Sequence, residues 1–272
     1  MIIRNMHGTT FENVVQKLLS DVPIIIDWFR SYEMVVNPDK IQVMFLGCGD
    51  QTFTINIGNY CITSKKSVKL LGVTIDQNLT FNDHINDMCR RANQKISALL
   101  RIRSYISTER AKLLCNAYIM SSFNYCPLVW ILFCSRGACL EINSTHQRAL
   151  RAIHLDFHTP SSQLFGVYNE TSVHTKNLRL LLVETFKSVR KLNPEFMWDL
   201  FKPAPVRYEL RCGDILRLPD IPIQKGQNTL IFRAVMAWNH LPSHAKSVAS
   251  LKEFRSVMGN TCSIYCQYRC CR

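Results

Sequence analysis

Lysine and arginine side chains cluster along one stretch of this 272-residue chain, between Asn82 and Arg103, where they could bind phosphate groups. Cationic side chains neutralise nucleic-acid phosphates without reading the base sequence. The chain has 33 Lys and Arg against 20 Asp and Glu, a formal charge of +13. This excess favours nucleic acid as the partner over an anionic membrane surface. The candidate nucleic-acid-binding residues are Lys66, Lys69, Arg90, Arg91, Lys95, Arg101, Arg103, Arg110, Arg148 and Arg151.

A helix is predicted to hold five of these ten cations, those between Asn82 and Arg103, because apolar residues recur in that stretch at three- and four-residue steps. Asn82 or Asp83 is placed to cap its start. The cations lie outside the apolar positions, so one face docks the helix and the others remain for binding. The apolar positions are Ile85, Met88, Cys89, Ala92, Ile96, Leu99 and Leu100.

The rest of the chain predicts an α+β fold that is mostly helical, with a small antiparallel β region before Asn82. A helix is expected over Phe11–Tyr32, with a kink or break at Pro23. A further helix is expected to start at Ser107. Short apolar or alternating runs predict strands at Ile41–Leu46, Phe53–Ile57, Tyr60–Thr63 and Val68–Ile75.

The uncharged run from Tyr118 to Phe133 has the length and hydropathy of a membrane span. Polar residues such as Asn124 interrupt it, and each polar group would need a partner in lipid. We therefore favour a buried core helix that breaks near Pro127. The start of the sequence shows no secretory signal pattern.

Twelve cysteines are scattered among helical patterns, which favours reduced thiols in an intracellular protein, nuclear or cytoplasmic. Four of them lie in the tail, where thiolates could hold zinc. Their spacing differs from that of a zinc knuckle and two are adjacent, so zinc is the weaker hypothesis and reduced, disordered thiols the alternative. The four are Cys262, Cys266, Cys270 and Cys271.

Several segments resemble, in order, the C-terminal part of reverse transcriptases from non-LTR retrotransposons, the jockey-like group especially. VKLLGVTIDQNLTFNDHINDMCRRANQKI looks like their primer-grip hairpin and first thumb helix. WFRSYEMVVNPDK, INIGNYCI, LLCNAYIMSSFNYCPLVW and THQRALRAI resemble further family motifs, and NTLIFRAVMAWNHLP resembles a late one. The resemblance covers about Phe11 to Cys270.

The resemblance implies four segments: a palm remnant with the primer-grip hairpin (1–80), a helical thumb (81–160), a C-terminal helical region (161–259) and a Cys-rich tail (260–272). It also implies an RNA or RNA/DNA duplex as partner, rather than a membrane or a small-molecule substrate. The family is an RNA-directed DNA polymerase that uses Mg²⁺. Lys40 falls where such polymerases place a lysine near the leaving pyrophosphate. Here it would be either a vestigial leaving-group site or a turn residue, and we favour the turn residue.

Polymerases of this kind need carboxylates that hold two metal ions, which the family takes partly from a Tyr-x-Asp-Asp turn. This sequence contains no adjacent Asp-Asp pair. We therefore expect no catalytic residue, no metal site and no cofactor in this chain, and no polymerase activity. Three hypotheses remain: a truncated, polymerase-dead remnant that binds nucleic acid, a non-enzymatic basic helical module, or a piece of an intact enzyme.

Overall fold

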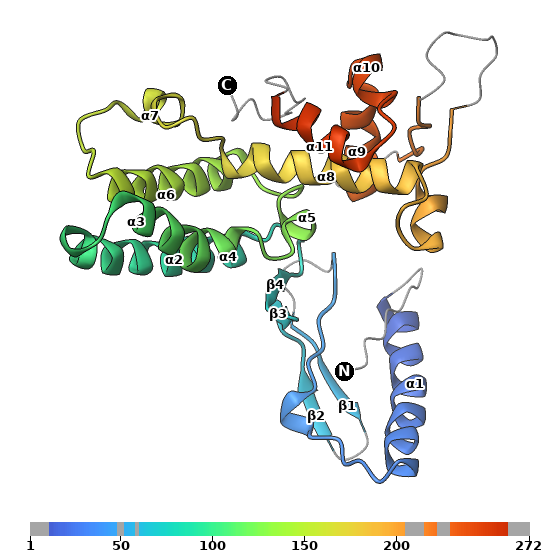
Figure 1. Ribbon diagram of the computed structural model, residues 1–272. Coiled ribbons are helices and arrows are strands. Elements are labelled where there is room, and N and C mark those ends of the chain that lie inside the picture. The colour runs from blue at the N-terminus through green and yellow to red at the C-terminus, as the bar shows by residue number, and fades with distance from the viewer. Residues whose placement is uncertain (1–10, 48–51, 58–59, 205–214, 222–228, 261–272) are drawn as a thin grey trace. The chain divides into compact units, whose positions relative to one another are not determined.

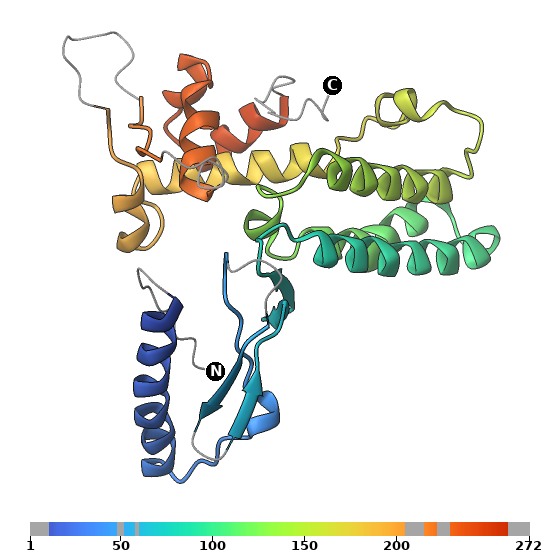
Figure 2. The same ribbon diagram turned by 180° about the vertical axis from the view of Figure 1, so that it is seen from behind.

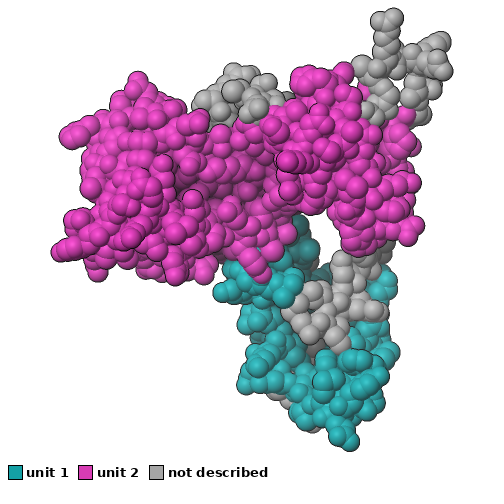
Figure 3. Space-filling view, viewed as in Figure 1, with its two compact units in different colours: residues 1–79 teal, residues 80–272 magenta. Residues whose placement is uncertain are grey.

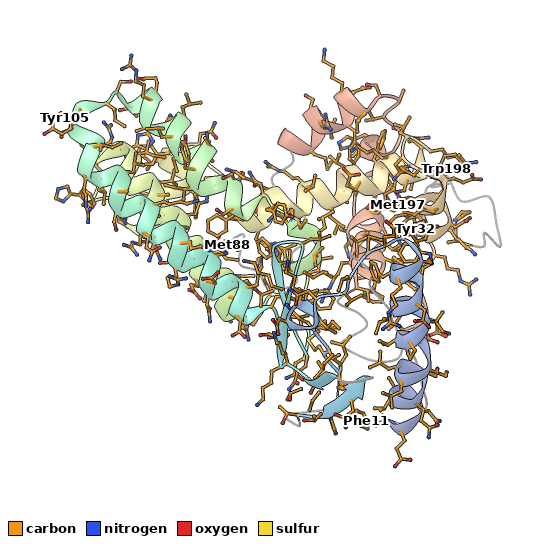
Figure 4. The ribbon with its side chains drawn as sticks, turned by 90° about the horizontal axis from the view of Figure 1, so that it is seen from below. Phe11, Tyr32, Met88, Tyr105, Met197 and Trp198 are labelled. Carbon is orange, nitrogen blue, oxygen red and sulfur yellow. The ribbon has the colours of Figure 1, made fainter. Side chains whose placement is uncertain are left out.

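The computed structural model describes residues 11–47, 52–57, 60–204, 215–221 and 229–260 (Figure 1). The fold is mostly helical with two small antiparallel two-stranded sheets, which confirms the predicted α+β class. The chain divides into two compact units, residues 1–79 and 80–272 (Figure 3). The four segments predicted at 1–80, 81–160, 161–259 and 260–272 remain a prediction.

In unit 1 the helix α1 (Phe11–Ser31) packs a stripe of apolar side chains against a small β sheet. Leu18, Val22 and Ile26 contact a core formed by Ile55 and Ile62. No described residue of α1 is fully buried, so this helix remains half-exposed along its length. A break in the helix at Pro23, one of the two predicted alternatives, is wrong, because α1 continues through that residue. The other alternative, a kink, remains a prediction.

Two hairpins follow in unit 1. β1 (Thr54–Ile57) pairs with β2 (Tyr60–Thr63), as predicted, with Thr54 opposite Thr63. The run predicted as one strand at 68–75 is itself a hairpin of β3 (Ser67–Leu70) and β4 (Val73–Asp76). Its two-residue turn, Leu71-Gly72, has positive φ at both positions, which matches the twist of the paired strands.

The strand predicted at Ile41–Leu46 is wrong. The segment follows the 3₁₀ turn η1 (Pro38–Lys40) and has no strand partner among the described residues. The Lys65 N–H donates to the Val43 carbonyl of this segment at 2.8 Å. Its apolar residues nevertheless join the core of unit 1, because Ile41, Val43 and Phe45 pack there.

Unit 2 begins with α2 (Asn82–Ile102), which starts differently from the prediction. Neither Asn82 nor Asp83 caps it. The N-cap is Phe81, in the left-handed conformation at φ 56°, with no side-chain cap. The Phe81 ring is 3% exposed and lies 5.5 Å from the Phe133 ring. Tertiary packing therefore supports the helix start, together with a hydrogen bond from the Asn82 N–H to Thr80 Oγ1 at 3.4 Å.

The buried face of α2 contains six of the seven predicted apolar residues, and also His84, which is 5% exposed. Leu100 is 37% exposed, because it lies at the edge of the apolar stripe. The face packs against α6 (Arg136–His154), and the two helices run side by side in both views (Figures 1 and 2). The residues of α2 that are fully buried there are Ile85, Met88, Cys89, Ala92, Ile96 and Leu99.

After the short 3₁₀ turn η2 (Arg103–Tyr105), α3 (Thr108–Leu114) is capped by Ser107, as predicted. α3 continues as a π-helix, η3 (Cys115–Met120), and then as α4 (Ser121–Phe123). A separate short helix, α5, begins at Pro127, which confirms a break in the uncharged run near this residue. No helix in the described part of the chain is long and apolar enough to cross a membrane.

The C-terminal helices pack around α8. Its Phe186 ring stacks on Phe254 of α11 at 4.4 Å and lies 6.5 Å from Trp238 of α9. Asn239 hydrogen-bonds both the N–H and the carbonyl of Leu216, which ties the chain before α9 to this core. The elements are α7 (Ser161–Val167), α8 (Val173–Val189), η4 (Glu195–Leu200), α9 (Leu230–Asn239), α10 (Ser243–Lys246) and α11 (Leu251–Asn260).

Candidate nucleic-acid interface

A polar groove runs between α2 and α6 on the surface of unit 2. It is open, with a volume of about 460 Å³. Arg90 stands on the α2 wall, whereas Arg148 and Glu141 stand on the α6 wall. The remaining lining residues are uncharged hydrogen-bonding residues of α2, namely Asn86, Asn93, Gln94 and Ser97. An open trough of this kind suits an extended polar strand better than a small molecule, whose pockets are mostly enclosed and apolar.

The exposed cations of α2 divide between two sides of the helix. Arg101 follows Arg90 by eleven residues, about three helical turns, so it lies on the groove side. Arg90, Arg101 and Arg148 are all exposed and form what we call the groove cations. For Arg101 and Arg148, no side-chain hydrogen bond or ion pair occurs among the described residues.

Arg91 and Lys95 lie on the other side of α2, toward η3. Lys95 Nζ donates to the Tyr118 carbonyl of η3 at 2.5 Å, which ties α2 to that helix. Asp87 accepts from Arg90 at 2.5 Å and from Arg91 at 2.8 Å, so one carboxylate is shared between the two sides. These pairs are largely exposed and contribute little to stability. The Lys95 ammonium therefore binds a backbone carbonyl, which does not neutralise its charge. The charge of Arg91 is only partly neutralised, because Arg91 shares the Asp87 carboxylate with Arg90.

Arg103 is a correction to the predicted binding set, because its guanidinium is buried. The residue is 8% exposed and donates to the carbonyls of Ile153 and Ile106, at 2.8 and 2.6 Å. It also donates to Thr108 Oγ1 at 2.8 Å. The side chain therefore joins the end of α2 to α3 and α6, and it is not available to a phosphate.

Arg151 is a second correction, for a similar reason. Its guanidinium donates to the carbonyls of Asp156 and Thr159, at 3.1 and 2.7 Å. It holds the loop that follows α6, in which Asp156 accepts from the Tyr168 hydroxyl at 2.7 Å. Hydrogen bonds from the side chain and backbone N–H of Thr159, and next from the Tyr168 hydroxyl, hold the pKa of Asp156 well below its usual range. Arg148 and Arg151, three apart on α6, therefore have different roles.

The other predicted cations lie apart from the groove or belong to unit 1. Arg110 is exposed on α3. Lys66 and Lys69 belong to unit 1, where both are exposed beside or within β3. Lys40 is exposed in η1, and the side chain of Asn37 accepts from the N–H of Asp39 at 2.9 Å, which makes the segment an ordinary turn.

Comparison with protein-family models, curated proteins and solved structures finds no match to this chain.

The groove includes residues that were not predicted. Asn86, Asn93, Gln94 and Ser97 were overlooked because the sequence analysis considered charges alone. Their spacing could have found them, since positions i, i+7, i+8 and i+11 share one side of a helix. Asn93 Oδ1 is buried at the groove without a hydrogen-bond partner among the described residues, so it can accept a hydrogen bond from a bound molecule.

Among the described residues, no group of three or more His, Cys, Asp or Glu side chains is placed to hold a metal ion. The tail cysteines Cys262, Cys266, Cys270 and Cys271 lie outside the described residues, so their zinc hypothesis remains a prediction. Cys139 Sγ lies 3.9 Å from His174 Nδ1, but both residues are buried, at 1% and 4% exposed, and no substrate could reach the thiol.

His146 is buried on α6 at 3% exposed. Burial, and next the positive charge of Lys176, lower the pKa of this ring to about 4 from an ordinary 6.5. The neutral ring is therefore the form that fits the folded protein. In the unfolded chain, His146 therefore binds a proton at a higher pH than it does in the folded protein.

We expect this histidine to destabilise the protein as the pH falls from about 6.5 toward 4. Full stability is present above pH 6.5, and the loss at pH 4 should be about 3 kcal/mol, since each pKa unit is worth about 1.36 kcal/mol. Denaturant unfolding of wild type and His146→Met at several pH values measures this. The pH dependence should be shallower in the variant, and equal slopes would contradict the assignment.

Proposed function

We propose that unit 2 binds a nucleic-acid backbone along the α2–α6 groove. The observation that carries this proposal is the pair of exposed arginines on opposite walls, Arg90 and Arg148, with Arg101 further along the same side. Hydrogen-bonding amides between them can contact phosphate and sugar oxygens. The whole chain has a formal charge of +13, and this positive charge attracts a polyanion at long range.

We further propose that the chain derives from the C-terminal part of a reverse transcriptase of a non-LTR retrotransposon. The support is the ordered resemblance of its motifs, together with a hairpin, β3–β4, directly before the cationic helix α2. The partner would then be RNA or an RNA/DNA duplex. A basic helical nucleic-acid-binding or interaction module unrelated to polymerases is the alternative, and it is favoured by the compact core of unit 2.

The purified chain should not polymerise nucleotides. No carboxylate pair of the kind that holds two catalytic metal ions is present in the sequence as an Asp-Asp turn. The measurement is incorporation on a primed RNA template with Mg²⁺ or Mn²⁺, against a control without protein. Templated extension by a preparation free of host polymerase would contradict the polymerase-dead reading.

Binding should be tolerant of sequence and strongly dependent on salt, because the expected contacts join arginines to phosphates. Fluorescence anisotropy with a labelled RNA/DNA duplex, repeated at increasing salt, measures the slope of log affinity against log salt. Each phosphate contact contributes about 0.7 to 0.9 to this slope. An affinity that does not change with salt would remove the electrostatic basis of the proposal.

A further inference from the structure

A small polar cavity lies between the π-helix η3 and α6, away from the groove cations. About 40 Å³ of it is open to water. Cys115, Asn116 and Met120 of η3 line one side, and His146 and His154 of α6 line another. Two buried ring nitrogens, His146 Nδ1 and His154 Nε2, have no hydrogen-bond partner among the described residues.

The size of this cavity restricts what it can hold. A buried water needs about 10–15 Å³ of such space, so the cavity has room for two or three waters and not for a larger organic molecule. A cation would also be unfavourable there. Glu170, the one carboxylate on the cavity wall, is already paired with Lys176 at 2.8 Å, and an unpaired buried ion is costly.

The hydrogen-bonding groups of the two histidines further restrict which molecule the cavity can hold. Each nitrogen of a neutral imidazole is a donor or an acceptor according to its tautomer, and water can satisfy either. Burial lowers the pKa of both His146 and His154, which favours neutral rings. The cavity therefore suits a small neutral molecule that both donates and accepts.

The surroundings fix the geometry of the site. The His154 ring stacks on Tyr168 at 3.7 Å, and the Tyr168 hydroxyl is held by Asp156 at 2.7 Å. A π-helix is wider than an α-helix, and such turns occur frequently at functional sites. At η3 the wider turn provides part of the cavity wall.

We propose that this cavity is a hydration site in which one or two ordered water molecules bridge His146 Nδ1 and His154 Nε2. The bridge joins two rings of α6 in a cavity that η3 partly encloses, through hydrogen bonds that no described residue supplies. It does not depend on the proposed nucleic-acid binding.

The test is water–protein cross-relaxation measured by NMR on the full chain with labelled histidine. The ring protons of His146 and His154 should both show cross-peaks to water with the sign of a bound molecule. In His146→Met the His154 cross-peak should disappear while the spectrum remains that of a folded protein. Should this variant not fold, His154→Leu gives the same comparison at His146.

No water cross-peak at either ring in the wild-type protein would overturn the proposal. A His154 cross-peak that is unchanged in His146→Met would also overturn it, because the water would then not be shared between the rings. Where neither variant folds, a crystal structure of the wild-type protein decides: water density within hydrogen-bond distance of both nitrogens supports the site, and its absence refutes it.

Discussion

Replacing Arg90, Arg101 and Arg148 together by glutamine should flatten the salt dependence of nucleic-acid binding by about 2 to 3 units of slope. The affinity at low salt should fall on the order of a hundredfold, because three phosphate contacts are lost. The fold should remain, since all three side chains are exposed and glutamine is a good helix former. Circular dichroism and anisotropy at several salt concentrations measure both effects.

The matched control removes the same charge elsewhere. Lys202, Lys252 and Arg255 are exposed, and the last two lie on α11, which packs against α8 and α10. Their triple glutamine variant should retain most of the affinity and the slope. Equal losses in the two variants would mean that binding follows net charge alone and that the groove has no special role.

A second comparison separates the two sides of α2. The double variant Arg91→Gln, Lys95→Gln should change the slope less than the groove variant, because Lys95 is tied to the Tyr118 carbonyl and Arg91 is paired with Asp87. A larger effect in the double variant would move the binding surface from the groove to the side near η3.

Periodicity predicted α1, α2 and the β1–β2 hairpin because each buries one apolar face, and such a face leaves a regular spacing in the sequence. Periodicity gave a wrong prediction where a contact between residues far apart in the sequence determined the local structure. At the start of α2 the Phe81 ring packs near Phe133, a contact with a residue distant in the sequence, and neither Asn82 nor Asp83 is the cap. The apolar run at 41–46 joins the core without a strand partner among the described residues, which local propensity does not reveal.

The candidate site was predicted only in part, for a related reason. A sequence shows where the cations are but not which of them hydrogen-bond to the protein itself. Arg90, Arg101 and Arg148 are exposed, whereas Arg103 and Arg151 donate to backbone carbonyls. No local signal marks Arg103, because one of its acceptors, the Ile153 carbonyl, lies 50 residues away in the chain, at the end of α6.

The second large prediction compares the effects of replacing Arg101 and Arg103 on the stability of the fold. Arg103→Gln should lower the free energy of unfolding by about 3 to 5 kcal/mol, because it removes a buried charged donor from two carbonyls and a hydroxyl. Arg101→Gln, two residues away and exposed, should change it by less than about 0.5 kcal/mol. Denaturant unfolding of the two variants measures the difference.

Binding should show the opposite order. Under conditions where both variants are folded, Arg101→Gln should reduce the salt slope by about 0.7 to 0.9, whereas Arg103→Gln should leave it unchanged. The reversal matters because general loss of structure would weaken both stability and binding in the same variant. If Arg103→Gln were as stable as wild type and bound with a reduced slope, its guanidinium would be a phosphate contact, and the internal role assigned to it would be wrong.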